Sequence, residues 1–520
     1  MVRRGAVAAV STLRPVAVSS LGPVAVAAAI LVLASQTLLP GVGFWDTAEL
    51  QTVGPLLGVA HPTGFPCYVI LAWLASVVLQ PFGDPAFRLN LLSALLVSVA
   101  AGTTVVLVRG LTGRTLLAVA AGLAMGTAPE AWSIATHADV HALHLALVAV
   151  LLVLLVGWED RVDRGDAASD RWLVAAGVVY GVAFANHVLV VLLAPGIAAY
   201  LTLVSPGIWR RRAFVARCGL AIAVTALAFY VELPIRAGPL RAPLVYDHPE
   251  TVVGFASSLL GAQFTGGLNP VGQPAARWTD LATLAFHQLG WLVALVPPGF
   301  IATAIRRPAY AALTGATVLL TVWFAGSYTN AEIARYYLVP VLMALTWVAF
   351  LGAWCVDVAG RWLDRTQLRA GRLALPAVAA LVIVAPSIAD LPARWGEVDE
   401  HETTIARRWL DGVLTELAPN AVVVSWWSYS TTLWYGQYID GLRSDVLVVD
   451  DRTRLDLDLG SPTDVIDRYL GVRPVYLIRL DNEGVDALGQ EFVLDTSGTA
   501  TGQPLVRVVG RRTANGIALP

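Results

Sequence analysis

The chain has 520 residues, of which 57% are hydrophobic and only 14% are charged. A soluble globular domain usually carries roughly 25% charged residues, so most of the surface of this chain cannot face water. The formal net charge is −2, which gives no electrostatic reason to expect a nucleic-acid partner. The three cysteines, Cys67, Cys218 and Cys355, have no regular spacing, which argues against a disulfide framework or a zinc ribbon. The composition predicts a polytopic α-helical membrane protein.

The first apolar run extends from Leu21 to about Leu39 and follows an Arg-bearing N-terminus. It is long enough to cross a bilayer, which takes roughly 20 residues. We interpret it as a membrane helix and not a cleaved signal peptide, because many apolar stretches follow and no small-residue cleavage site is persuasive. Eleven spans are predicted, at about 21–39, 89–108, 115–129, 141–157, 172–186, 188–204, 213–232, 285–304, 308–326, 336–356 and 371–389.

A further apolar stretch, 66–82, decides the predicted topology. If it lies along the membrane surface, nearly all short Arg-rich loops fall on the cytoplasmic side, as the positive-inside rule requires. If it crosses, every later loop inverts and the rule fails repeatedly. We therefore expect an interfacial helix, a cytoplasmic N-terminus and an outward-facing polar surface on the cell (inner) membrane. The segments assigned to the cytoplasm are the N-terminus, 109–114, 159–171, 209–217, 306–308 and 360–372.

The composition changes at about residue 390, beyond which charges are frequent and the apolar segments are short. Strand-like segments that alternate with helical ones predict a small α/β domain. We expect a transmembrane domain at 1–390 and a soluble extracytoplasmic domain at 391–520. The expected helices lie at 402–417, 429–441 and 462–471, and the expected strands at 421–426, 445–450, 474–480 and 504–510.

The segment 44–66, FWDTAELQTVGPLLGVAHPTGFP, directly follows the first predicted span. Asp46 and Glu49 are three residues apart and share one face if the segment is helical. A carboxylate at a membrane surface can act as a general base and take the proton from an acceptor hydroxyl. His61 follows at the start of the predicted interfacial helix. We predict that Asp46 and Glu49 are catalytic; a solvated loop acid or a helix cap is the alternative for Asp46.

The next outward-facing loop, PEAWSIATHADVHALH, gathers His137, Asp139, His141 and His144 at the start of a helix. His137 and His141 are four residues apart, a spacing that can bind a divalent metal together with an acid, although the order differs from HExxH. Hydrogen bonding to a substrate, with Asp139 as a second acid, is another functional reading. Polar capping of the helix is the structural alternative.

Three arginines are expected on the same side, namely Arg88, Arg236 and Arg335, the last directly before Tyr336. Guanidinium groups match phosphate oxygens bidentately, so the three predict a phosphate site. Each alone is more often a lipid-headgroup contact or an ion-pair partner. The pair Asn186-His187 lies in or near a span, where polar groups serve function or helix packing.

The aromatic segment 425–438, SWWSYSTTLWYGQY, could stack on sugar rings or enter lipid, but we favour a place in the core of the C-terminal domain. The sequence contains no P-loop, Rossmann fingerprint, GxSxG elbow or CxxC pair. These absences argue against ATP, NAD and simple hydrolase chemistry.

The stretch FWDTAEL…LGVAHPTGFPCYVILAWL…FRLNLLSAL resembles the opening of the protein O-mannosyltransferase-like group of the GT-C glycosyltransferases. That group has an acid-bearing loop, a His-Pro-x-Gly-x-Pro stretch and an Arg-x-Asn, here Arg88 to Asn90, before the next helix. AWSIATHADVHALH is similar to its second outer loop, with Asp139 where the group tends to have Glu. FANHVLVVLLAPG, LPIRA…DHPE and ARYYLVP are similar to later landmarks. The chain departs from the group at Trp427-Ser428, where Gly-Asp is frequent, which weakens any role for that loop.

The resemblance implies a GT-C-like fold with an interfacial helix after the first span. It also implies an inverting transfer of a sugar, mannose before arabinose or another sugar, from a polyprenyl-phosphate donor to an acceptor. The acceptor is left open between a protein, a glycan and a glycolipid. Asp46 would be the general base, with Glu49 beside it, and no cofactor is implied, although a divalent metal stays open. The implied substrate-binding residues are His61, Arg88, Asn90, His137, Asp139, His141, Asn186, His187, Arg236, Arg335 and Tyr336.

A membrane transporter or flippase of a lipid-linked or polar substrate is the main alternative from another class, followed by a membrane scaffold or sensor. Transporters usually show internal repeats and polar breaks near the middle of the membrane. Here the polar residues are expected on one side, no repeat is evident, and a sizeable outer domain follows. The sequence therefore favours the glycosyltransferase.

Overall fold

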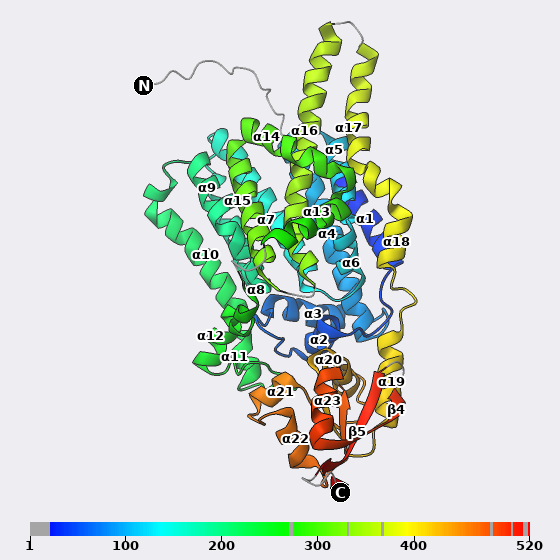
Figure 1. Ribbon diagram of the computed structural model, residues 1–520. Helices are drawn as coiled ribbons and strands as arrows, with labels where there is room; N and C mark the ends of the chain where they lie inside the picture. The colour runs from blue at the N-terminus through cyan, green and yellow to red at the C-terminus, as the bar shows by residue number, and fades with distance from the viewer. Residues whose placement is uncertain are drawn as a thin grey trace.

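A computed structural model describes residues 21–269, 274–329, 332–365, 369–478, 482–500, 503–512 and 518–519. Long helices run alongside one another in a bundle, and a smaller part with a β-sheet packs against one end of that bundle (Figure 1). The Arg-bearing N-terminus, which the predicted topology assigns to the cytoplasm, lies outside the described residues.

Each of the eleven predicted apolar stretches contains a helical segment. The helices in this region are α1 (Leu21–Ser35), α4 (Pro85–Thr112), α5 (Thr115–Gly126), α6 (Pro129–Thr136), α7 (Val140–Asp163), α8 (Ser169–Asn186), η1 (Val188–Leu193), α9 (Ala194–Val204), η2 (Ile208–Arg210), α10 (Arg212–Tyr230), α11 (Glu232–Ala237), α12 (Val252–Leu260), η3 (Ala262–Gly267), α13 (Pro274–Leu289), η4 (Gly290–Leu295), α14 (Val296–Arg306), α15 (Pro308–Ser327), η5 (Ile333–Tyr337), α16 (Leu338–Arg365), α17 (Arg369–Ala389) and α18 (Leu391–Val398).

Within the described residues, six continuous helical segments are long and apolar enough to cross a membrane. A seventh is added if Leu373–Ala389 and Leu391–Val398, which meet at an angle of 47°, form one span. Leu21–Ser35, Thr115–Gly126 and Val188–Val204 are apolar but shorter. The chain is therefore a multi-pass membrane protein, and the count of about eleven spans stays a prediction.

Small residues bring the backbones of the first helices close together. A Cβ atom added to Gly102 of α4 would lie 2.8 Å from the carbonyl oxygen of Pro23 in α1. One added to Gly122 of α5 would lie 2.8 Å from the carbonyl oxygen of Ala101 in α4. Close approach of this kind is how helices associate in lipid, where there is little hydrophobic driving force between them.

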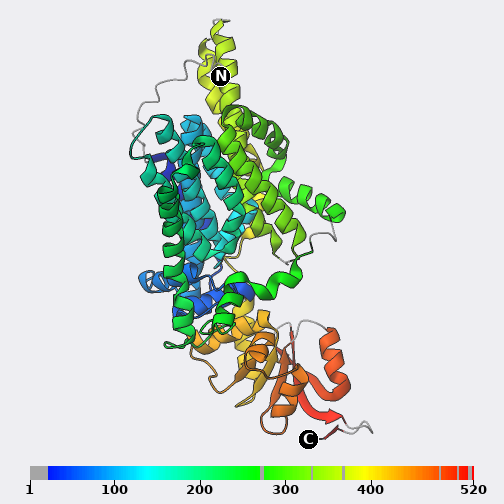
Figure 2. The same ribbon diagram turned by 90° about the vertical axis from the view of Figure 1, so that its left-hand side faces the viewer.

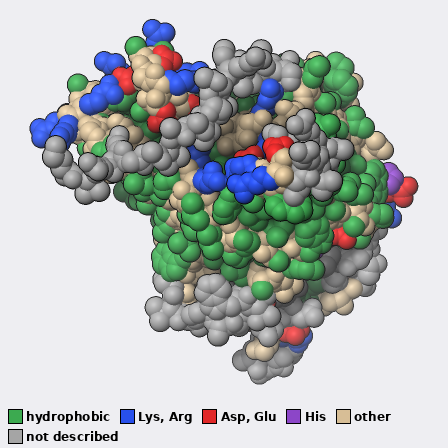
Figure 3. Space-filling model, turned by 90° about the horizontal axis from the view of Figure 1, so that it is seen from above, with side chains coloured by type: hydrophobic (Ala, Val, Ile, Leu, Met, Phe, Trp, Pro, Cys, Tyr) green, Lys and Arg blue, Asp and Glu red, His purple; other side chains and the backbone are tan. Residues whose placement is uncertain are grey.

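The described parts of the Arg-rich loops assigned to the cytoplasm lie toward the same end of the bundle, where Figure 3 shows clusters of blue Arg side chains with acidic ones between them. Arg307 lies 3.4 Å from a carboxylate oxygen of Glu159, and Arg114 pairs with Asp357 of α16. These ion pairs join loops that are far apart in the sequence. The contacts support the prediction, made from the positive-inside rule, that these segments lie on the same side of the membrane.

Two short helices, α2 (Trp45–Leu56) and α3 (Pro66–Val78), lie across the other end of the bundle (Figure 1). A helix of 13 residues spans about 20 Å, too short for a hydrocarbon core of about 30 Å. The surface of α3 includes exposed apolar side chains, such as Leu74 and Val78. The length and the crosswise direction of α3 favour the interfacial reading of 66–82.

The C-terminal part has the helix and strand alternation that the sequence predicts. Its sheet has the strand order β2-β1-β3-β5-β4, with β6 on β5; β1 pairs in parallel with β2 and β3, and the other pairs are antiparallel. Strand β4 and helices α21 and α23 were not expected. The elements are α19 (Ile405–Glu416), β1 (Val422–Ser425), α20 (Trp427–Trp434), η6 (Tyr435–Ile439), β2 (Leu447–Val449), α21 (Asp451–Asp456), α22 (Pro462–Tyr469), β3 (Val475–Ile478), α23 (Asn482–Glu491), β4 (Phe492–Ala500), β5 (Gln503–Arg512) and β6 (Ala518–Leu519).

The sheet-bearing part joins the bundle through helix α20, directly beneath α2 (Figures 1 and 2). The Thr432 hydroxyl donates a hydrogen bond of 2.9 Å to the carbonyl oxygen of Gly43, and Tyr435 accepts one from the backbone of Ala86. A single apolar cluster contains Val53 and Leu433 together with residues of both parts. The carboxyl end of β1 therefore faces the end of the bundle that carries α2.

Gly54 allows α2 to pack against α3 and α4, because a Cβ atom there would lie 2.8 Å from side-chain carbons of both Ala72 and Leu89. We expect Gly54→Ala to lower the melting temperature of the purified protein, since overpacking typically costs about 1–3 kcal/mol. Gly396→Ala is the matched control, because Gly396 is an exposed helical residue with open space around it. Equal melting temperatures for the two variants would contradict this account of α2.

Candidate functional site

A cavity of 520 Å³ lies where α2, the start of α7, η5 and the C-terminal part meet. Its walls come from segments that are distant in the sequence, and they include the apolar side chains of Leu260, Leu268 and Phe324. Six of the predicted site residues line it: Asp46, His61, His141, His187, Arg335 and Tyr336.

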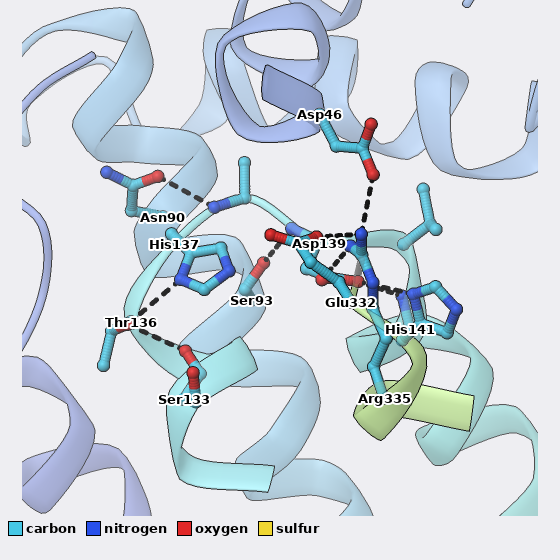
Figure 4. Close-up of polar contacts among 12 residues, drawn as sticks. Asp46, Asn90, Ser93, Ser133, Thr136, His137, Asp139, His141, Glu332 and Arg335 are labelled. Carbon is cyan, nitrogen blue, oxygen red and sulfur yellow. Dashed lines mark hydrogen bonds and ion pairs between the residues drawn. The ribbon is translucent and has the colours of Figure 1, made fainter. Parts of the chain in front are cut away.

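Arg335 is the centre of an ion-pair cluster at this cavity (Figure 4). Its Nη1 donates to Asp139 Oδ2 over 2.9 Å, and its Nη2 donates to Asp46 Oδ2 over 2.8 Å. Nη2 also donates to the carboxylate of Glu332, one turn before it in the chain. The side chain of Arg335 is 10% exposed and that of Asp139 is 1% exposed, so these charges are held away from bulk water.

The charges of the cluster keep its acids ionised. Burial by itself would raise the pKa of Asp46, but the charges of His61 and Arg335 outweigh burial and lower that pKa. Burial would likewise raise the pKa of Asp139, and Arg335 and His141 bring it well below its usual range. Asp46 therefore offers an ionised carboxylate, the form that a general base requires.

Asp139 both caps a helix and binds a charged group of the site. Its Oδ1 accepts a hydrogen bond of 2.6 Å from the backbone N–H of His141 and so caps α7. The ring Nδ1 of His141 lies 2.9 Å from the same oxygen. The cap fixes Asp139 at the helix start, and the other oxygen is left to bind Arg335.

Glu49 and His61 form a second acid–base pair on α2 and the loop before α3. The backbone N–H of His61 donates to Glu49 Oε1 over 2.7 Å, and the ring Nδ1 contacts Oε2. Glu49 is fully buried and does not line the cavity, whereas His61 does. Glu49 thus holds His61 in place, and its catalytic role stays a prediction.

Aromatic and imidazole rings pack together on the wall of the cavity. The rings of His141 and His187 have centroids 4.8 Å apart, and Tyr336 stacks on His141 at 5.5 Å. His141 Nε2 and Arg335 Nε are buried and have no hydrogen-bond partner among the described residues. Buried polar atoms of this kind are usually satisfied, so both are available to a ligand oxygen.

Asn90 and Asn186 shape the site without lining the cavity. Asn90 Oδ1 accepts from the side chain of Gln51 and from the backbone of Ala138, while its Nδ2 donates to the carbonyl oxygen of Leu39. Asn186 donates to the carbonyl oxygen of Val140 over 3.1 Å. These amides tie together the loops that carry Asp46 and Asp139.

Arg88 and Arg236 do not line the cavity, although the sequence analysis predicts that they bind phosphate together with Arg335. Arg88 donates to three backbone carbonyl oxygens at the end of α3, including that of Ser76 at 3.0 Å. Arg236 donates to the carbonyl oxygens of Leu56 and Leu57. Both guanidinium groups therefore hold the ends of α2 and α3, where helix carbonyls lack partners.

His137 lies apart from His141 and lines a second cavity of 310 Å³. Asp46 and Glu332 line this cavity as well, together with Glu400 from the start of the C-terminal part. Asp46 therefore lines both cavities. The larger one also contains the imidazole and aromatic rings, and the smaller one contains Glu332 and Glu400.

A divalent metal was considered for His137 and His141, but the described residues gather metal-binding atoms elsewhere. Asp46, Glu49 and His61 each have a ligand atom within 4.8 Å of the others. An ion there would have to separate the direct contact between Glu49 and His61. The cluster can serve as an acid–base group without a metal.

Glu332, Trp427, Arg452 and Tyr246 were not recognised as site residues from the sequence. Glu332 is three residues from Arg335, so its pairing follows helical spacing. Trp427 and Arg452 enter the cavity from the C-terminal part, where no spacing within the sequence indicates it. Trp427 had been assigned to the core of the C-terminal domain; its side chain is instead partly exposed and lines the cavity.

Residues 46–206 match the family model described as the protein O-mannosyl-transferase TMEM260 N-terminal domain. Mouse protein O-mannosyl-transferase TMEM260 is 30% identical over 247 residues, which are 46% of this chain and 33% of the mouse protein. The chain thus spans about a third of the length of this curated relative. The matched range begins at Asp46 and contains both acidic loops.

The fold is similar to that of ArnT from Cupriavidus metallidurans bound to undecaprenyl phosphate, with a TM-score of 0.61, 16% identity and coverage of 96% of this chain and 98% of ArnT. The chain has a GT-C fold. The archaeal oligosaccharyltransferase AglB from Archaeoglobus fulgidus, in complex with an inhibitory peptide and a dolichol-phosphate, gives a TM-score of 0.51 at 12% identity, over 82% of this chain and 64% of AglB. The predicted resemblance to the GT-C glycosyltransferases is confirmed.

Glu130, at the start of α6, has a pKa raised to about 7 by burial and by the charge of Asp139. An unfolded Glu has a pKa of about 4.3, so the folded state binds more protons between the two values and loses stability as the pH rises through them. We expect Glu130→Gln to raise the melting temperature relative to the wild type at about pH 8 and to leave it unchanged at about pH 4.

The exposed Glu402, replaced in the same way, is the matched control and should have no effect at either pH. A Glu130→Gln effect of equal size at both pH values would show that the change is steric and not linked to protonation.

Proposed function

We propose that the chain is an inverting glycosyltransferase that moves a sugar, most readily mannose, from a polyprenyl-phosphate donor to an acceptor hydroxyl. The observation that carries the proposal is Asp46, an ionised carboxylate held by Arg335 on the wall of a cavity that is also lined by apolar side chains. The name of the mouse relative supports O-mannosyl transfer, and the lipid phosphates in the ArnT and AglB structures support the donor class.

In the proposed reaction, the acceptor oxygen attacks the anomeric carbon while its proton passes to Asp46. The bond between that carbon and the phosphate oxygen breaks, and the electron pair leaves with the lipid phosphate. An in-line displacement needs the acceptor and the phosphate on opposite sides of the sugar, which inverts the anomeric centre. Arg335 holds Asp46 in position for this transfer, and Asp139 holds Arg335.

The apolar side chains that line the cavity suit the prenyl chain of the donor. Leu260, Leu268 and Phe324 are among them, and the rings of His141 and Tyr336 lie near the acids. The unpartnered Arg335 Nε can donate to an oxygen of the donor, and His141 Nε2, whose ring Nδ1 faces Asp139, can accept a hydrogen bond from a sugar hydroxyl. The second cavity, which reaches Asp46 from the side of Glu400, is the proposed path for an acceptor hydroxyl of a protein, glycan or glycolipid.

We further propose that residues 1–390 form the transmembrane catalytic domain and residues 391–520 an extracytoplasmic α/β domain. The site then faces the outer side of the inner membrane. The ion-paired Arg-rich loops at the opposite end of the bundle support this orientation.

Asp46→Asn should abolish sugar transfer while the protein still folds and inserts, because the amide cannot accept the proton. The measurement is transfer of label from a radiolabelled polyprenyl-phosphate mannose in membranes that contain the full chain. The matched control is Asp458→Asn, on an exposed residue whose left-handed backbone Asn tolerates well. Transfer by Asp46→Asn at the wild-type rate would remove Asp46 from the role of general base.

A reporter fused after residue 110 should be found in the cytoplasm and one fused after residue 395 outside. The reason is that the first position lies beside the Arg-rich turn between α4 and α5, and the second lies in α18 near the site. Paired activity reporters, one active only in each compartment, give the measurement. The reverse pattern would mean that 66–82 crosses the membrane and that the site faces inward.

A further inference from the structure

The C-terminal sheet directs the carboxyl ends of its parallel strands toward the cavity. Trp427 follows β1 (Val422–Ser425) and Arg452 follows β2 (Leu447–Val449), and both residues line the same space as Asp46 and His61. In the strand order β2-β1-β3, β2 and β3 lie on opposite sides of β1. The connection that follows β1 and the one that follows β2 therefore run in opposite directions across the sheet. In open α/β sheets, ligands bind beyond the carboxyl ends of the strands at such a change of direction.

Arg452 is held in place by aromatic rings. Its guanidinium carbon lies 4.6 Å from the centroid of the Trp427 ring and 5.5 Å from that of Tyr246. The indole N–H of Trp427 donates to the Tyr246 hydroxyl over 3.2 Å, and the indole ring meets His61 edge to face at 5.6 Å. Stacking uses the faces of the guanidinium, and the Nη1 atom at its edge is buried and makes no hydrogen bond among the described residues, so this atom can donate to an oxyanion.

The charges of the cavity call for a second cation. Among the described residues, Arg335 and Arg452 are the two arginines that line it. Arg335 is bonded to the carboxylates of Asp46, Asp139 and Glu332, which together exceed its single positive charge. An anionic donor would therefore meet repulsion there unless another cation compensates. Arg452 is that cation, and it comes from a different part of the chain.

We propose that Arg452, stacked on Trp427, binds the phosphate of the lipid-linked donor. This inference rests on the proposed function and assigns to Arg452 the contact that the sequence had suggested for Arg88 and Arg236. When the bond from the anomeric carbon to the phosphate oxygen breaks, the phosphodiester monoanion becomes a phosphomonoester dianion, and the acceptor proton passes to Asp46. A bidentate guanidinium stabilises the charge that develops on the leaving group. The C-terminal part is thus required for donor binding.

The first experiment measures binding of farnesyl phosphate, a short polyprenyl phosphate, to the purified full-length protein in detergent. We expect Arg452→Gln to weaken binding at least tenfold and to flatten its dependence on salt concentration. Arg468→Gln, on an exposed arginine of the neighbouring helix α22, should bind like the wild type. Unchanged affinity in Arg452→Gln would overturn the proposal. If that variant fails to fold, Arg452→Lys, which keeps the charge without the planar stack, should show an intermediate loss.

Kinetics distinguish the donor phosphate from an anionic group on the acceptor. With Arg452→Gln, we expect a raised KM for the lipid-linked sugar, a lowered kcat and an unchanged KM for the acceptor. A raised KM for the acceptor alone would overturn the assignment to the donor. If the wild type transfers no sugar from any lipid-linked donor, the proposed function fails, whereas the binding experiment still decides whether Arg452 holds a polyprenyl phosphate.

Discussion

The ion pairs of Arg335 are the interaction on which the site depends. They connect three segments that are distant in the sequence: α2 with Asp46, the start of α7 with Asp139, and η5 with Glu332 and Arg335 itself. Breaking a buried ion pair by removal of one partner typically costs about 3–5 kcal/mol, because the other charge is left buried and unpaired. The same contacts that keep Asp46 ionised therefore also fix the distance between the crosswise helix and the bundle.

The site is assembled at the junction of the two parts of the chain. The bundle supplies the acids, the imidazoles and apolar side chains to the cavity, and the sheet-bearing part supplies Trp427 and Arg452. A shared apolar cluster and the hydrogen bond from Thr432 to Gly43 keep these walls together. A substitution that loosens this junction would change the cavity without touching Asp46. Donor binding and the packing of the C-terminal part are in this way coupled.

Much of the fold and part of the site follow from local sequence signals. Hydrophobic runs located the helices because each must be apolar along its whole length to lie in lipid. The spacing of Asp46 and Glu49 put both on α2, but the structure sends Glu49 to His61 and leaves Asp46 in the cavity. Arg88 and Arg236 show the limit of such signals. A guanidinium that caps backbone carbonyls and one that faces a ligand look the same in a sequence.

Local patterns in the sequence predict a helical membrane protein with a sheet-bearing C-terminal part, and they place the acids in its first loop. These are properties of hydrophobic length, alternation and spacing, which act over a few turns or strands. Which polar residues contact one another depends on the packing of the folded chain. Arg335 reaches Asp46 across 289 positions, and Arg452 stacks on Trp427 where two strands end side by side. No local pattern encodes such contacts, because they depend on how the bundle and the sheet pack together.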